Sequence, residues 1–157
     1  MKGPGKSNAP NKIYVVNRSQ GRLEHLVRLA EEWGSSSQII PLVTHDSSVA
    51  DKVIYSMNPG SLVVNATGLG KDAPGSPITD GAQFPDGGFV WDFNYRGDLL
   101  FLDQASLQKQ KRSLTLVDGW DYFVIGWTQV IADIFDLDIP TKGHLYDILS
   151  QQAKERI

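Results

Sequence analysis

Short apolar runs alternate along this chain with longer segments in which apolar residues recur at helical spacing. The short runs are rich in β-branched residues and predict strands at 13–16, 39–43, 61–65, 88–94 and 114–117. The longer segments predict helices between Ser19 and Gly34, from a cap at Asp46 or Ser47 to Met57, and at 99–111, 120–135 and 145–157. Pro41 interrupts the second strand and predicts that it lies at a sheet edge, because proline cannot donate a ladder hydrogen bond.

Strands that alternate with helices and carry uninterrupted apolar runs are typical of a parallel sheet buried on both faces. We therefore expect an α/β fold, a mostly parallel sheet with helices on both faces and Ile13–Val16 beside Ile39–Val43. Residues 1–12, mainly Gly, Pro, Lys, Asn and Ser, predict a flexible leader, and residues 13–157 a single domain. On such a sheet, functional residues follow the carboxyl ends of the strands.

Composition narrows the classes of function. A net charge of −3 over 157 residues argues against a broad basic surface for nucleic acid. The chain has no cysteine, which excludes disulfides, thiol nucleophiles and cysteine-held metals and suits the cytoplasm. No apolar run approaches the ~20 residues of a membrane span. The 3 histidines lie far apart without carboxylate companions, so we expect no metal site.

The segment after the first predicted strand, 17–22, brings two arginines and an amide to a strand end. In a dinucleotide-binding sheet, an acidic residue at the end of the second strand holds the ribose 2′-hydroxyl of NAD, whereas arginine favours the 2′-phosphate of NADP. Arg18 and Arg22 therefore predict a phosphate clamp. The alternative is a polar turn in which Ser19 caps the helix, and the sequence leaves both open.

Three further strand ends carry small or aromatic residues. The loop 66–70 follows the third predicted strand, and its small side chains let backbone approach a ligand, although glycine-rich loops are common. Tyr95 follows the fourth predicted strand and stands next to Arg96. It either orders a ligand or packs at the rim of the sheet. Asp118 follows the fifth and is placed to cap the next helix, with Gly119 permitting close approach. The aromatic residues of 120–135 indicate core packing together with an interface.

Four segments resemble, in order, motifs from the NADP-binding half of the shikimate dehydrogenases and their quinate/shikimate dehydrogenase-like relatives. They are Val16-Asn17-Arg18-Ser19-x-x-Arg22, Val64-Asn65-Ala66-Thr67-x-Leu69-Gly70, Asp92-Phe93-Asn94-Tyr95 and Val117-Asp118-Gly119-x-x-x-x-Val124. In that family the first clamps the adenosine 2′-phosphate and the second lies along the cofactor. The tyrosine of the third faces substrate and nicotinamide, and the glycine of the fourth contacts the nicotinamide. The likeness runs from about Lys12 to Asp138.

The resemblance implies a Rossmann-like domain and a set of binding residues. The cofactor-binding residues implied are Asn17, Arg18, Ser19 and Arg22 at the adenosine end, Asn65, Ala66 and Thr67 along the middle, and Gly119 at the nicotinamide. Tyr95 is the implied substrate-binding residue. The implied activity is that of a cytoplasmic oxidoreductase of aromatic amino acid biosynthesis, moving hydride between NADP and a small hydroxylated carboxylate.

The chain departs from the family pattern in three ways. The family's first strand with its glycine-rich loop has no counterpart, nor has the catalytic domain that supplies a proton-transferring lysine and aspartate. Gly126 stands where the family carries a substrate-binding glutamine. We therefore expect a truncated domain, inactive alone, that needs a catalytic domain or partner chain, so whether it is an enzyme stays open. The alternative is a non-catalytic interaction module that forms a homodimer through the helix at 120–135.

Overall fold

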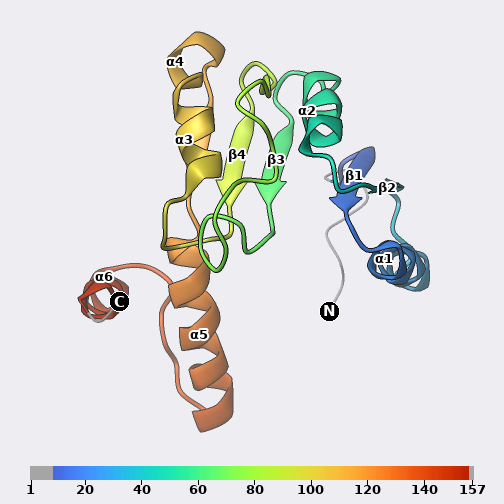
Figure 1. The fold of residues 1–157 in the computed structure, drawn as a ribbon. Helices are drawn as coiled ribbons and strands as arrows, with labels where there is room; N and C mark the ends of the chain where they lie inside the picture. The colour runs from blue at the N-terminus through green and yellow to red at the C-terminus, as the bar shows by residue number, and fades with distance from the viewer. Residues whose placement is uncertain (1–8, 156–157) are drawn as a thin grey trace.

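The computed structural model of the protein describes residues 9–155, so most of the predicted leader lies outside the described residues. The chain alternates strands and helices, as expected (Figure 1). The elements are β1 (Lys12–Asn17), α1 (Gln20–Glu32), β2 (Gln38–Val43), α2 (Ser47–Tyr55), β3 (Leu62–Asn65), β4 (Phe89–Asp92), α3 (Leu100–Ser106), α4 (Lys109–Arg112), β5 (Thr115–Val117), α5 (Trp120–Phe135) and α6 (His144–Lys154). The helix expected at 99–111 is thus two shorter helices, α3 and α4.

All strand pairs in the described part of the chain are parallel, which confirms the α/β class. The strand β1 pairs with β2, with Ile13 opposite Ile39 and Val15 opposite Pro41, so the predicted neighbours are correct and the proline lies on an edge strand. The strands β3, β4 and β5 form a second sheet in that order. The expectation of one continuous sheet is therefore wrong. The strands are divided between a sheet of two and a sheet of three.

The core lies on one face of the three-stranded sheet. The buried side chains there come from α2, β3, the loop before β4, β4, α3 and the residue just before β5, and they are Ala50, Ile54, Val63, Ile78, Ala82, Phe84, Val90, Phe101, Ala105 and Leu114. Phe84 meets Phe101 edge to face with ring centroids 5.8 Å apart. The glycine- and proline-rich segment between β3 and β4 is a loop that also supplies part of the core.

The opposite face of the same sheet remains exposed. The in-register pairs Leu62–Phe89 and Val64–Trp91 place these four side chains on one side, and Val117 continues the row. Leu62 is 52%, Val64 39%, Phe89 50% and Val117 44% exposed. The prediction of helices on both faces is thus wrong for this sheet, because α2 and α3 pack on the side of Val63 and Val90 only.

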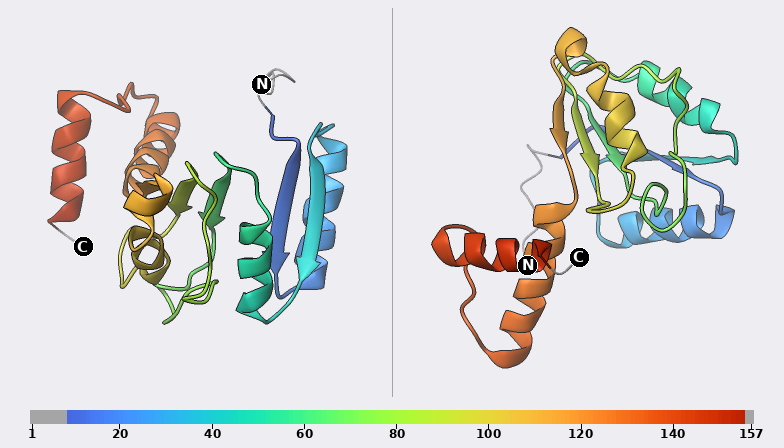
Figure 2. Two further views of the ribbon diagram at one scale, coloured as in Figure 1. Left: turned by 90° about the horizontal axis from the view of Figure 1, so that it is seen from above. Right: turned by 60° about the vertical axis from the view of Figure 1, so that its left-hand side comes forward.

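The last two helices project from the carboxyl edge of the sheet and contact one another (Figure 2). The Trp120 indole donates to the Ser150 hydroxyl at 2.7 Å, and the Gln129 amide donates to the Ile139 carbonyl at 2.8 Å. The Tyr146 hydroxyl donates to Asp121, and burial together with that bond raises the pKa of Tyr146 to about 12.

Within residues 9–155, no helix combines the length and the apolar character needed to cross a membrane.

Candidate functional site

Each of the four motif segments begins within the last two residues of a strand and continues past its end. The strand β1 ends at Asn17, β3 at Asn65, β4 at Asp92 and β5 at Val117. Figure 1 shows the arrowheads of β1 and β3 pointing to the same edge, and β4 and β5 run parallel to β3. The segments after β3, β4 and β5 lie together in one sheet, whereas the segment 17–22 follows a strand of the other sheet.

A buried amide–carboxylate pair joins the ends of β3 and β4. The Asn65 amide nitrogen donates to both carboxylate oxygens of Asp92, at 3.1 and 3.2 Å. The side-chain oxygen Oδ1 of Asn65 accepts from the backbone N–H of Thr67 at 3.0 Å and from the Thr67 hydroxyl at 2.7 Å. The side-chain amide of Asn94 donates to the backbone carbonyl of Leu69 at 2.9 Å. Because Asn65 is only 1% exposed and its polar atoms are all bonded, it positions the loop after β3.

Burial shifts the pKa of the Asp92 carboxyl group. Removal from solvent raises the pKa of Asp92, and the nearby Asp118 adds to the rise. Hydrogen bonds from the Asn94 backbone and from Asn65 oppose it by stabilising the carboxylate. The folded state therefore holds a proton on Asp92 more tightly than the unfolded state does, so the contribution of this group to stability falls as pH rises through its folded-state pKa.

Tyr95 lies in an aromatic cluster flanked by cations. Its ring stacks on Phe123 with centroids 3.9 Å apart and an interplanar angle of 17°. The Lys71 ammonium lies 5.3 Å and the Arg96 guanidinium 5.6 Å from the ring centroid. Lys71 also pairs with Asp72 at 3.2 Å. Arg96 is the neighbour of Tyr95 in the sequence, so its proximity could be predicted. The proximity of Lys71 could not, because Lys71 comes from the loop after β3.

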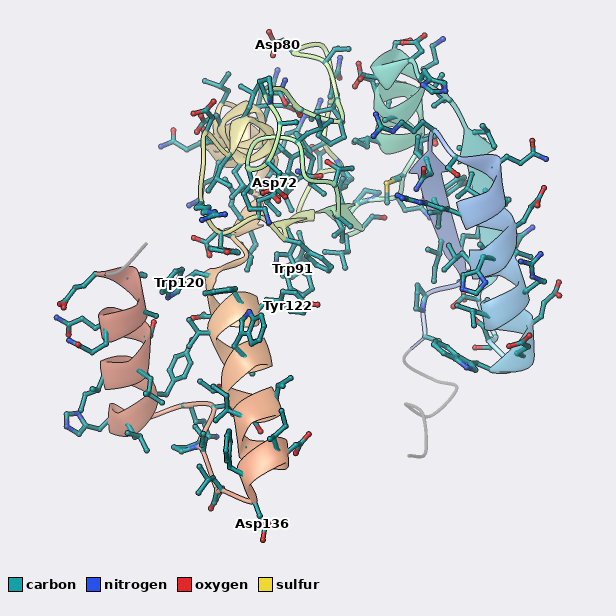
Figure 3. All side chains as sticks on the ribbon, turned by 60° about the horizontal axis from the view of Figure 1, so that its bottom comes forward. Asp72, Asp80, Trp91, Trp120, Tyr122 and Asp136 are labelled. Atoms are coloured by element: carbon teal, nitrogen blue, oxygen red, sulfur yellow. The ribbon has the colours of Figure 1, made fainter. Side chains whose placement is uncertain are left out.

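A second aromatic contact lies where α5 meets the sheet. Figure 3 shows Trp91 and Tyr122 next to one another, and their rings meet edge to face at 5.9 Å. The Trp91 indole donates to the Asp118 carbonyl at 3.2 Å. The Asp118 carboxylate accepts from the backbone N–H of Trp120 at 3.0 Å, but Gly119 occupies the N-cap position of α5, so the prediction that Asp118 caps this helix is wrong by one residue.

The two arginines of the segment after β1 are exposed to solvent. The Asn17 side chain accepts from the Ser19 backbone N–H at 2.9 Å and so shapes the turn. Ser19 occupies the N-cap position of α1, but its side chain makes no capping hydrogen bond. Arg18 and Arg22 are exposed, and within residues 9–155 neither one forms an ion pair. The two guanidiniums are therefore available to an anion.

Two glycines near Tyr95 lie where a side chain would collide with backbone. A Cβ on Gly119 would lie 2.1 Å from the Phe93 carbonyl oxygen, and one on Gly97 would lie 2.2 Å from the Gly70 carbonyl oxygen. Gly119 is thus required by the close approach of the β5–α5 turn to the end of β4. The sequence did not single out Gly97, whose φ of +88° also favours glycine.

Other features of the described residues lie away from these strand ends. An open depression between α1 and β2 is lined in part by Leu23, Val27 and Pro41. No group of three or more potential metal ligands occurs within residues 9–155.

Comparisons of the chain with protein-family models, with curated proteins and with solved structures found no match.

Proposed function

We propose that this chain is the NADP-binding part of a shikimate dehydrogenase-like oxidoreductase with a Rossmann-like fold. The observation that carries the proposal is that the four family-like segments all fall at the carboxyl ends of parallel strands in an α/β domain. Ligands of open parallel sheets bind at that edge. Residues 1–157 hold no segment like the family's glycine-rich loop or its catalytic domain, so the role proposed for these residues is cofactor binding.

The adenosine end of NADP fits the segment after β1. Arg18 and Arg22 are exposed and available to a phosphate, and Asn17 stands where a carboxylate would repel it. The guanidinium fork matches the oxygens of a phosphate group. Ser19 adds a hydroxyl that is not used in capping. These four residues would hold the 2′-phosphate and thereby select NADP over NAD.

The remaining proposed contacts lie at the ends of β3, β4 and β5. Ala66 and Thr67 are exposed on the loop that Asn65 positions, so they would line the middle of the cofactor. Gly119 would lie near the nicotinamide. Tyr95, with the cations of Lys71 and Arg96 beside its ring, would bind a substrate carboxylate. When bound, NADP supplies the hydride acceptor or donor, and these residues supply binding and orientation.

The two arginines provide the test of this proposal. We expect Arg18→Ala and Arg22→Ala each to weaken NADP binding by roughly ten- to a hundredfold, because a hydrogen bond to a charged group contributes ~1.5–3 kcal/mol. NAD binding should barely change, since NAD has no 2′-phosphate. Calorimetric titration of the three proteins with both cofactors measures this. Arg28→Ala, on the same helix as Arg22, is the matched control and should leave both affinities unchanged.

Three outcomes would contradict the clamp. They are equal affinity of the unaltered chain for NAD and NADP, equal losses for both cofactors in the arginine variants, and the same loss in Arg28→Ala. Absence of any binding would favour the second candidate function, a non-catalytic interaction module. The observation that favours that alternative is the exposure of large apolar residues on α5, among them Trp127, Ile134 and Phe135.

The isolated chain should have little or no dehydrogenase activity. General acid–base groups are worth ~10²–10⁴ in rate, and the family's proton-transferring lysine and aspartate have no counterpart here. Steady-state NADP reduction with shikimate and with quinate measures this. Turnover near 1 s⁻¹ or above, an ordinary enzyme rate, would show that catalytic groups lie within these 157 residues.

A further inference from the structure

An open pocket lies at the amino ends of β4 and β5, away from the strand ends that carry the candidate cofactor site. It has a volume of about 440 Å³ and lies between residues 80–83 and the helical segment of α3 and α4. The backbone N–H of Gly87, shortly before β4, donates to the carbonyl of Arg112, shortly before β5, at 2.7 Å. In Figure 1, α4 accordingly lies at the end of the sheet opposite to the arrowheads of β3 and β4. A ligand in this pocket therefore does not depend on the cofactor proposal.

The wall of this pocket includes a buried amide whose oxygen has no donor. Gln104 lines the pocket and is only 7% exposed. Its amide nitrogen donates to a carboxylate oxygen of Asp80 at 2.7 Å, and this bond decides which end of the amide is the oxygen. The amide oxygen is buried and has no hydrogen-bond partner among the described residues. A buried acceptor without a donor destabilises the folded chain, so a donor group that reaches this oxygen gains affinity.

The pocket offers one negative and one positive group that the described residues leave available. One carboxylate oxygen of Asp80 accepts from Gln104, and no hydrogen bond within residues 9–155 uses the other. Lys111 also lines the pocket, is exposed, and forms no ion pair with a described residue. Arg112 is already paired with Asp86 at 3.0 Å. A ligand that carries both a cation and an anion therefore matches the pocket better than one that carries a single charge.

The helical wall sets the separation between these two groups. Gln104, Leu107 and Lys111 are spaced by three and four residues and all line the pocket, so they follow one face of the α3–α4 segment. At the rise of an α-helix, Gln104 and Lys111 lie roughly 10 Å apart along its axis. Leu107 lies between them and is 87% exposed, so it presents an apolar surface there. A methylene chain fits this surface, whereas an α-amino acid is too short to reach both charged groups.

From these features we propose that the pocket binds a small ω-amino carboxylate, a molecule with an ammonium group and a carboxylate at opposite ends of a methylene chain. The ammonium group donates to the Gln104 amide oxygen and to the unused oxygen of Asp80. The methylene chain lies on Leu107, and the carboxylate pairs with Lys111. Because the Gln104 oxygen is buried, a small side-chain movement must admit the ammonium group, and such changes are common on binding.

Titration of the isotope-labelled chain with ε-aminocaproate tests this site by nuclear magnetic resonance. We expect the ligand to shift the side-chain amide signals of Gln104 and the backbone amide signals of Leu107 and Lys111. Caproate lacks the ammonium group and should bind at least about tenfold more weakly, because a hydrogen bond from a charged donor is lost. Hexylamine lacks the carboxylate and should bind about two- to fivefold more weakly, the range for loss of an exposed ion pair.

Three variants make the result specific. Gln104→Met keeps the size of the side chain but removes the acceptor, and should weaken ε-aminocaproate binding at least about tenfold. Lys111→Glu changes an exposed residue, so the chain stays folded, and should weaken binding about fivefold or more by repelling the carboxylate. Lys109→Glu makes the same charge change on α4 outside the pocket and should leave the affinity nearly unchanged.

Three results would overturn the proposal. The first is the absence of any shift at Gln104 with tens of millimolar ε-aminocaproate. The second is equal affinity for ε-aminocaproate and caproate, which would mean that no ammonium group is recognised. The third is an equal loss of affinity in Lys111→Glu and Lys109→Glu, which would mean that only the net charge of the chain matters. The two lysine variants decide the outcome even where Gln104→Met does not fold.

Discussion

Replacing Asn65 by aspartate is expected to cost about 3–5 kcal/mol of the free energy of unfolding at pH 7, the range for a buried charge that loses its partner. In the wild type the Asn65 amide donates to both oxygens of Asp92 at 3.1 and 3.2 Å. Asn65→Asp keeps the shape but sets two carboxylates against each other. Urea denaturation of the two proteins measures the difference.

The penalty should shrink as the pH falls. The pKa of Asp92 is already raised by burial, and a second carboxylate raises it further, so the folded variant gains stability when one carboxyl takes up a proton and donates in place of the amide. The double variant Asn65→Asp with Asp92→Asn exchanges the two groups and should recover more than half of the loss. A cost below about 1 kcal/mol at pH 7, or no recovery in the exchanged pair, would contradict the proposed positioning role.

Replacing Gly119 by alanine should destabilise the fold by about 3 kcal/mol or more, at the upper end of overpacking costs. The φ of −84° at this residue suits alanine, so the cost comes from the Cβ, which would lie 2.1 Å from the Phe93 carbonyl oxygen. For a chain of this length each kcal/mol lowers the melting temperature by about 2–4 °C. Thermal unfolding followed by circular dichroism measures the shift.

Gly126 provides the matched control. It lies within α5, and a Cβ there meets no atom within 4 Å. Gly126→Ala should therefore raise stability by roughly 0.5–1 kcal/mol, the usual gain from alanine in a helix. Similar melting temperatures for the two variants would show that the β5–α5 turn does not pack against the end of β4 as closely as described.

Much of the fold could be predicted because its signals are local. The apolar runs at 13–16 and 39–43 are strands, Pro41 lies on an edge strand, and Asp46 caps α2 by accepting from Ser48 at 2.8 Å. The division into two sheets could not be predicted, because strand pairing depends on contacts between distant segments. The burial of Phe84 could not be predicted either, because the loop that contains it has no periodic pattern of apolar residues.

For the candidate site, too, local features could be predicted from the sequence and contacts between distant segments could not. The segments after the strands could be read from the sequence, since each directly follows an apolar run. The partner of Asn65 could not, because Asp92 lies 27 residues away and only the pairing of β3 with β4 brings them together. Lys71 approaches Tyr95 for the same reason. The sequence therefore indicated candidate ligand contacts better than the residues that position them.

Amide chemical-shift mapping is the most direct test of whether the segment after β1 selects NADP. The ligands are adenosine 2′,5′-bisphosphate and adenosine 5′-monophosphate, which differ only in the 2′-phosphate. We expect the bisphosphate to shift the amide signals of residues 17–22 and the side-chain signals of Arg18 and Arg22. The monophosphate at the same concentration should leave these signals nearly unchanged. Equal shifts with both ligands, or shifts confined to residues outside 17–22, would contradict it.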